Sequence, residues 1–357
     1  MDDAGNSPRG RRAFLNHAGL VLAGAGLGSV ALRAQGQRPT RHTDTQHLTL
    51  ALCARPSMAH LPLTLAQALG FFEAEGVSVR WLDVATDEAA LQAVHRGAAH
   101  VAACAYPLTI AQHARGAAWR SLVLQTRTPQ VVLGVSSRDL PGFKGPADLR
   151  GKKVGLLYPG TTDMVLEAVL QRARLHPGQL TWVHSDDAQA LVRRFRAGQL
   201  DALCAGDARV WALEQQGQLR VVADTRSQRG TSELFGGVVP GSAVCAPEAW
   251  AVSHPGLAQK LADGVVHALK WLHTAGPADL LRAVPSAHVE VGRAQYLFAV
   301  DQARDGFSPD GVLTAEAAST ALKVLGRLDH QVRTAWIDLE RTYTNEFTLR
   351  AKTRFRV

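Results

Sequence analysis

The sequence has few cysteines and no concentrated charge. Only four cysteines occur in 357 residues, and none lies in a CxxC or Cys/His metal-binding pattern. The 39 lysine and arginine residues are spread among 31 acidic residues without a basic run, which argues against a nucleic-acid-binding surface. The chain also lacks a GxSxG nucleophile elbow before a helix, which argues against a serine hydrolase of that type. The formal net charge of +8 therefore indicates a solvated basic surface that mildly favours anions.

The four cysteines, Cys53, Cys104, Cys204 and Cys245, each lie in a strand-like apolar run. We interpret them as small buried hydrophobic residues, although an oxidising compartment would permit a disulfide.

The first 34 residues differ from the rest. Arg11 and Arg12 precede Phe14 and Leu15, and the uncharged stretch AGLVLAGAGLGSVAL follows. This pattern predicts a twin-arginine-like signal peptide over residues 1–34, with cleavage after Ala31 or Ala34. A disordered tail with a short buried helix, or an uncleaved anchor, is the alternative, but the stretch is shorter than the ~20 apolar residues of a membrane span. The remaining chain has no apolar run long enough to span a membrane, so we expect a soluble periplasmic product.

From His47 onward strands and helices alternate, which predicts α/β lobes built on mostly parallel sheets. LTLALC, VSVRWLDV and HVAACA are strand-like, and helical segments separate them. The same plan recurs about a hundred residues later, where FRAGQLDALCAGDA matches VHRGAAHVAACAYP. Thr86 is placed to cap one of these helices, and Gly97 to end it.

The repeat predicts two doubly wound lobes. Residues 46–133 would form the first part of lobe 1, residues 134–236 lobe 2, and residues 237–357 the return to lobe 1 with C-terminal helices. The chain would cross between lobes at Val131 to Val135 and between Gly236 and Cys245, and two such crossings form a hinge.

Several stretches together resemble the nitrate/taurine/alkanesulfonate (NitT/TauT, SsuA/THI5-like) substrate-binding proteins of ABC importers. They are SMAHLPLTLAQALGFFEAEGVSV, AYPLTIAQHARG, DLRGKKVGLLYPGTTDMVLEAVL, FRAGQLDALCAGDA, FSPDG and IDLERTYTNEF. The resemblance covers nearly all of the chain after the signal and implies the type II periplasmic binding fold. It also implies a receptor for a small anionic solute that serves an ABC permease and an ATPase and has no catalytic activity or cofactor. We expect the receptor to act as a monomer.

The loops after the strands are the expected binding positions, because ligands of open α/β sheets lie beyond the C-terminal strand ends. In lobe 2, Gly160 allows close backbone approach, and Thr161 and Thr162 can donate to an anion, or simply cap their helix. Asp207 would bind a ligand amine, bridge the lobes or cap the following helix.

In lobe 1 the corresponding candidates are Ser57 and His60, for which a structural role of the histidine is equally open. Tyr106 would line the cleft or pack on the lobe surface. Arg127 is the candidate side-chain cation for an anionic group, with a solvated surface arginine as the alternative.

Two other functions suit the same scaffold. The resemblance includes proteins that bind or synthesise the pyrimidine precursor of thiamine. By that resemblance the synthases carry clustered cysteines and an active-site lysine, and no cysteine cluster occurs here. A periplasmic sensory module is the other alternative, whereas a transcription factor is disfavoured because no helix-turn-helix segment is present.

Overall fold

The structure is a computed structural model that describes residues 45–357. These residues belong to one compact unit. The predicted signal peptide at residues 1–34 lies outside the described part of the chain. Within residues 45–357, no helix combines the length and the apolar character needed to cross a membrane.

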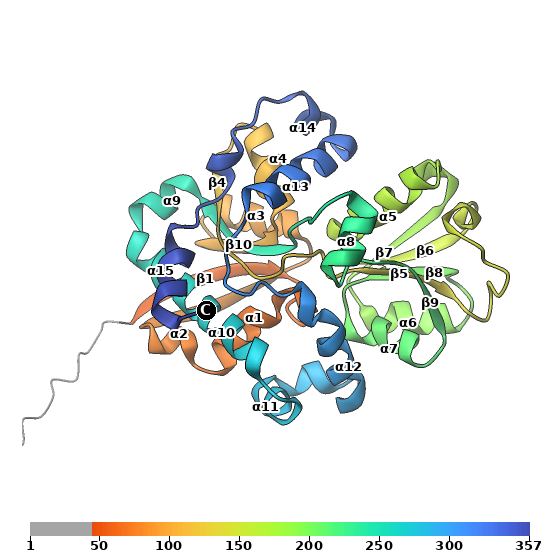
Figure 1. Cartoon of the computed structure of the whole chain (residues 1–357), viewed down its shortest axis with the longest axis horizontal. Coiled ribbons are helices and arrows are strands. Elements are labelled where there is room, and N and C mark those ends of the chain that lie inside the picture. The colour runs from red at the N-terminus through yellow and green to blue at the C-terminus, as the bar shows by residue number, and fades with distance from the viewer. Residues whose placement is uncertain (1–44) are drawn as a thin grey trace, which may run out of the picture. The chain divides into compact units, whose positions relative to one another are not determined.

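The strands form two five-stranded sheets (Figure 1). The first sheet has the order β2-β1-β3-β10-β4, and its strands are β1 (Gln46–Cys53), β2 (Val77–Val84), β3 (Val101–Ala105), β4 (Trp119–Leu124) and β10 (Ser242–Pro247). The second has the order β7-β6-β8-β5-β9, and its strands are β5 (Val132–Ser136), β6 (Lys153–Leu157), β7 (Thr181–Ser185), β8 (Ala202–Ala205) and β9 (Leu219–Asp224).

The two sheets have the same topology. Three strands of each pair in parallel, and the fourth runs antiparallel to both of its neighbours. This fourth strand is β10 in the first sheet and β5 in the second. Both carry a register shift, between Val244 and Cys245 and between Leu133 and Gly134. The α/β architecture with two like lobes, predicted from the internal repeat, is confirmed.

Helices cover both faces of each sheet (Figure 1). In the first lobe α1, α2 and α10 pack on one face, and α3, α4 and α13 on the other. In the second lobe α6 and α7 cover one face, and α5 and α8 the other. The α-helices are α1 (Leu61–Ala68), α2 (Phe71–Ala74), α3 (Asp87–His95), α4 (Pro107–Ala114), α5 (Thr161–Arg172), α6 (Ala188–Arg196), α7 (Ala208–Gln215), α8 (Gln228–Phe235), α9 (Glu248–Ser253), α10 (Pro255–Thr274), α11 (Pro277–Ala283), α12 (Arg293–Ala303), α13 (Ala315–Leu328), α14 (His330–Thr334) and α15 (Glu346–Phe355). The short 3₁₀ helices are η1 (Met58–His60), η2 (Pro146–Leu149), η3 (Pro177–Gln179), η4 (Ser286–Val289), η5 (Arg304–Gly306) and η6 (Leu339–Thr342).

Local sequence signals explain where these helices begin. The Thr86 hydroxyl accepts a hydrogen bond of 3.0 Å from the Ala89 amide, so the predicted cap of α3 is confirmed. Gly97 follows α3 with φ +72°, a conformation that glycine adopts without steric cost. All four cysteines are buried free thiols on β1, β3, β8 and β10, as expected for small hydrophobic residues.

The chain passes between the sheets twice, after β4 and after β9. These crossing segments, residues 125–131 and 225–241, are hydrogen-bonded to each other. The Gln130 amide donates to the Thr225 carbonyl (3.1 Å), and the Thr225 amide to the Val131 carbonyl (2.9 Å). At the other end of the pair, the Gly241 amide donates to the Thr126 carbonyl (3.0 Å). The first crossing ends at Val131, where the predicted Val131 to Val135 crossing begins, and the second ends within the predicted Gly236 to Cys245 segment.

Candidate functional site

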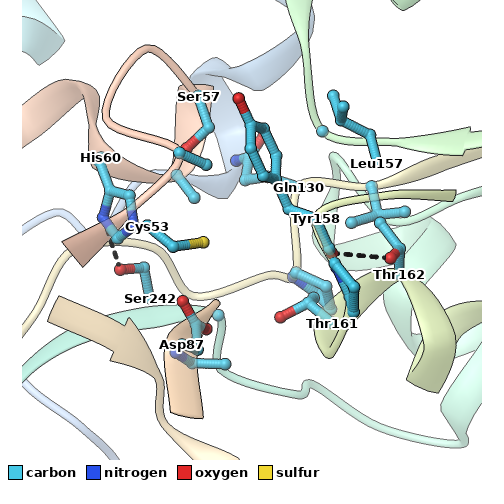
Figure 2. A pocket seen from close by; sticks show the side chains of 18 residues that line it. Cys53, Ser57, His60, Asp87, Gln130, Leu157, Tyr158, Thr161, Thr162 and Ser242 are labelled. Atoms are coloured by element: carbon cyan, nitrogen blue, oxygen red, sulfur yellow. Dashed lines mark hydrogen bonds between the residues drawn. The ribbon is translucent and has the colours of Figure 1, made fainter. Parts of the chain in front are cut away.

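A cavity opens where the loops of both sheets meet (Figure 2). Its walls include residues that follow β1, β6 and β8, the last residue of β3, and residues of the two crossing segments. The space between the lining atoms is about 570 Å³ and includes open solvent at the mouth. The lining consists of Cys53, Ala54, Ser57, Ala59, His60, Asp87, Ala105, Pro129, Gln130, Val131, Leu157, Tyr158, Pro159, Thr161, Thr162, Gly206, Gly241 and Ser242.

Five of the eight sequence-predicted residues meet at this place. Ser57, His60, Thr161 and Thr162 line the cavity. Gly160 lines an adjoining hollow between α4, α5 and α13, which shares Thr161 with the first cavity. Ser57 and His60 come from the first lobe and the threonines from the second, so the cavity brings the two predicted loop sets together.

The other three predicted residues lie outside the lining of both hollows. Tyr106 is fully buried, and its hydroxyl shares a 2.7 Å hydrogen bond with Thr342. Arg127 forms an ion pair of 3.0 Å with Asp305. Asp207 is buried and caps α7 by accepting from the Arg209 amide at 2.7 Å. The cap is the structural alternative that the sequence left open for Asp207. Tyr106 lies in the interior rather than on the lobe surface, and Arg127 is paired rather than free in solvent.

His60 is a buried, neutral member of the lining. Its Nδ1 lies 3.1 Å from the Ser242 hydroxyl and 3.4 Å from the Gln125 amide nitrogen. Burial lowers the pKa of His60 from 6.5 to about 4. The side chain therefore carries no positive charge at neutral pH and cannot serve as a counter-ion for an anion.

The beginning of α5 offers fewer free donors than the sequence suggests. Gly160 adopts φ +116°, and its amide donates to the Asp163 carboxylate in the first turn. The Thr162 hydroxyl donates to the Tyr158 carbonyl at 3.0 Å. The Thr161 hydroxyl and the amides of the first turn remain as donors toward the cavity, and Asp163 partly offsets the positive end of the helix dipole.

Sequence reasoning missed several lining side chains. Tyr158 follows β6 in the left-handed conformation (φ +55°) and stands across the cavity from Ser57 (Figure 2). Its position was a usable signal, because Tyr158 comes two residues before Gly160, Thr161 and Thr162, which the sequence predicts as binding positions. Gln130 and Ser242 come from the crossing segment and from β10, where no local motif marks them.

Asp87 is the most consequential of the missed residues. It is the first residue of α3, and its carboxylate accepts from the Ala105 amide at 3.0 Å. Burial, together with the nearby charge of Glu88, raises the pKa of Asp87 from 3.8 to about 6, although the Ala105 hydrogen bond opposes this. Burial, and then Asp87, raise the pKa of the adjacent Cys53 thiol well above its usual range, so this cysteine stays protonated.

The sequence profile described as NMT1/THI5 like matches residues 57–274, more than half of the chain. The chain belongs to the NMT1/THI5-like family. A solved protein of Bordetella bronchiseptica RB50 is 35% identical with a TM-score of 0.82, and the match covers 88% of this chain and 99% of that one.

More distant structures share the fold of this NMT1/THI5-like protein. The alkanesulfonate-binding protein SsuA from Xanthomonas axonopodis pv. citri, bound to MOPS, is 18% identical with a TM-score of 0.60, over 85% of this chain and 97% of that one. The desulfurization enzyme DSZB is 18% identical with a TM-score of 0.56, over 87% of this chain and all of that one. No curated protein matches the sequence. Since one neighbour is a binding protein and the other an enzyme, the fold alone does not decide function.

Proposed function

We propose that this NMT1/THI5-like protein is the receptor of an ABC importer, which captures a small solute with an anionic group by closing its two lobes. The observation that carries this proposal is the cavity lined by loops of both sheets. Two crossing segments join the sheets there, as expected for a hinge. A solute that contacts both walls only in the closed form shifts the protein toward that form.

The anionic group would lie against the beginning of α5. The Thr161 hydroxyl and the first-turn amides supply donors there, and the helix dipole favours negative charge. Ser57 supplies a hydroxyl from the other lobe. The solute would thereby contact both lobes, which is what couples binding to closure.

The chemistry of the cavity favours binding over catalysis. Cys53 is the thiol in the lining, and a thiol that stays protonated is a poor nucleophile. The neutral His60 has its Nδ1 engaged by Ser242 and Gln125, which limits its use as a general base.

The proposed location is the periplasm, with export by the twin-arginine route and delivery of the solute to a permease and an ATPase. The Arg11–Arg12 pair and the following apolar stretch support export. The name of the neighbour SsuA, an alkanesulfonate-binding protein, supports a role in solute capture.

A thermal-shift screen of the purified protein tests the proposal. Alkanesulfonates, nitrate, carboxylates and pyrimidines form the panel. A bound solute at a hundred times its dissociation constant adds about 2.7 kcal/mol to the free energy of unfolding. Small-angle X-ray scattering should show a smaller radius of gyration with that solute.

Thr161→Ala should weaken binding about fivefold, because one neutral hydrogen bond contributes roughly 1 kcal/mol. Thr353→Ala is the matched control, since Thr353 lies exposed on α15 and outside the cavity lining. Equal affinity of wild type and Thr161→Ala would remove α5 from the site. Binding without compaction would contradict closure.

A further inference from the structure

A third segment of the chain lies along the hinge, beside the first crossing segment. It comprises residues 303–311, which follow α12 and include η5, and we call it the return segment. The Arg127 amide donates to the Gly306 carbonyl (2.8 Å), and the Ser308 amide donates to the Gln125 carbonyl (2.9 Å). The bridge between the two segments is antiparallel. The first crossing segment is therefore bonded on both sides, to the second crossing segment and to the return segment.

Gly306 is packed against both crossing segments without room for a side chain. A Cβ at this position would lie 1.9 Å from Nε2 of Gln130 and 2.4 Å from the Thr128 hydroxyl, both in the first crossing segment. It would also lie 2.5 Å from the Arg226 carbonyl oxygen in the second crossing segment. Because no Cβ tolerates such contacts, the return segment approaches both crossings at a point where only glycine fits.

Asp305, the residue before Gly306, is bonded to both crossing segments through its side chain. Its Oδ1 accepts from the Arg127 guanidinium at 3.0 Å, and its Oδ2 accepts from the Gln228 amide at 2.9 Å. The Asp305 carbonyl oxygen also accepts from Nε of Arg127 at 2.8 Å. Arg127 belongs to the first crossing segment, and Gln228, the first residue of α8, belongs to the second. One carboxylate thus ties together two segments that are distant in the chain.

The two ends of the return segment lead to different lobes. It follows α12, which packs beside α7 of the second lobe (Figure 1). Tyr296 and Val300 of α12 share a hydrophobic cluster with Trp211 of α7. At the other end, the Leu124 amide of β4 donates to the Gly311 carbonyl (2.9 Å), so the segment ends on the first sheet. Rotation of one lobe against the other must therefore change the path of the return segment or its contacts with the crossing segments.

We propose that the return segment is a clasp on the hinge. Asp305 and Gly306 hold the two crossing segments in the arrangement of this structure, and the strength of this hold sets the balance between the lobe arrangements. This inference rests on the proposed closure of the lobes and concerns its control rather than the solute. Neither residue lines the cavity or the adjoining hollow. Asp305 is therefore a positioning residue, which acts on binding through the population of the lobe arrangement that binds.

Distance measurements between the lobes test the clasp on the purified protein without added solute. Gln92→Cys on α3 and Gln171→Cys on α5 place one spin label on each lobe, because both glutamines are exposed. The four native cysteines are buried free thiols, so the labels should react with the two introduced thiols. Double electron–electron resonance then gives the distribution of distances between the labels.

Asp305→Ala should raise the ratio of the minor to the major lobe arrangement about 5- to 30-fold, because it removes two hydrogen bonds that hold the crossing segments. The distance distribution should broaden or gain a second maximum. Gly306→Ala should also change it, since the added Cβ would push the two crossings apart. Asp301→Ala is the matched control, because Asp301 lies exposed on α12 and its carboxylate has no hydrogen bond within residues 45–357.

Urea unfolding of the same variants separates the clasp from a purely structural role. A lower free energy of unfolding in Asp305→Ala, with the distance distribution of the wild type, would make Asp305 a structural contact and overturn the inference. Equal broadening in Asp301→Ala would also overturn it, because loss of any charge on this part of the chain would then suffice. Asp305→Ala carries the test if Gly306→Ala does not fold.

The clasp and the receptor function can fail separately. The variants are compared without solute, so a negative result there leaves the receptor function standing. The wild type is then measured with each solute of the thermal-shift panel that binds. Binding without any change in the distance distribution would contradict lobe closure and, with it, the clasp.

Discussion

Replacing Asp87 by asparagine should stabilise the empty protein, and the gain should depend on pH. Burial raises the pKa of Asp87 from 3.8 to about 6, because the folded protein disfavours the charged carboxylate. The unfolded chain holds this proton less tightly than the folded one. Ionisation of Asp87 therefore leaves the free energy of unfolding unchanged at pH values below the pKa of the unfolded chain. It lowers the free energy of unfolding as pH rises through the pKa of the folded protein.

The difference between the two pKa values corresponds to about 3 kcal/mol when Asp87 is fully charged in both states. About 2 kcal/mol of this destabilisation should disappear when the pH is lowered from 7.5 to 4.5. Asparagine has the same shape, carries no charge and can accept from the Ala105 amide. The variant should therefore exceed the wild type in stability at pH 7.5, and this advantage should shrink by about 2 kcal/mol at pH 4.5.

Urea unfolding of wild type and Asp87→Asn at several pH values between 4.5 and 7.5 measures this difference. Asp186→Asn is the control, because Asp186 is exposed and lies outside both hollows. Its effect should stay within about 0.5 kcal/mol at each pH. An advantage of Asp87→Asn that stays constant or grows as pH falls would refute the argument that Asp87 is buried without a counter-charge.

Two further predictions concern the hinge and the neighbouring histidine. Gly241→Ala should lower the free energy of unfolding by about 1–3 kcal/mol in urea titrations, because its Cβ would lie 2.1 Å from the Thr128 carbonyl oxygen. Gly256→Ala, which meets nothing within 4 Å, should change stability little, and equal effects would contradict the steric argument. The pKa of His60 is lowered from 6.5 to about 4 in the folded protein. Between these pH values the unfolded chain binds a proton at His60 and the folded chain does not, so the free energy of unfolding should fall as pH drops from 6.5 to 4. His60→Gln should lose less stability over that range in the same titrations, whereas an unchanged pH dependence would show that His60 does not cause the loss.

Much of the fold was predictable from the sequence because its signals are local. The repeated order of strand, loop, helix and glycine lies within short segments, and the same order appears twice. Thr86 and Gly97 mark the two ends of α3 through contacts with residues close to them in the chain. The likeness of the two halves then predicted two lobes of one topology, which the strand orders confirm.

The loops that form the cavity were also predictable, because strand ends of an α/β sheet meet at one edge. Ser57, His60, Thr161 and Thr162 reach the cavity for this reason. Their positions follow from strand order and loop direction, both of which the alternating pattern already indicates. Pattern and topology thus located the walls of the cavity.

Only the tertiary structure decided which polar side chains face the cavity. Tyr106 turns away because its hydroxyl meets Thr342, 236 residues further along the chain, and Arg127 because it meets Asp305. Asp87 has the sequence context of an ordinary first-turn acid, and its burial at the cavity depends on Ala105 and on the packing of β3. Such contacts join residues that are distant in sequence, and no local pattern encodes them. The sequence therefore determined the scaffold and its loops, and the long-range packing determined the charge of the site.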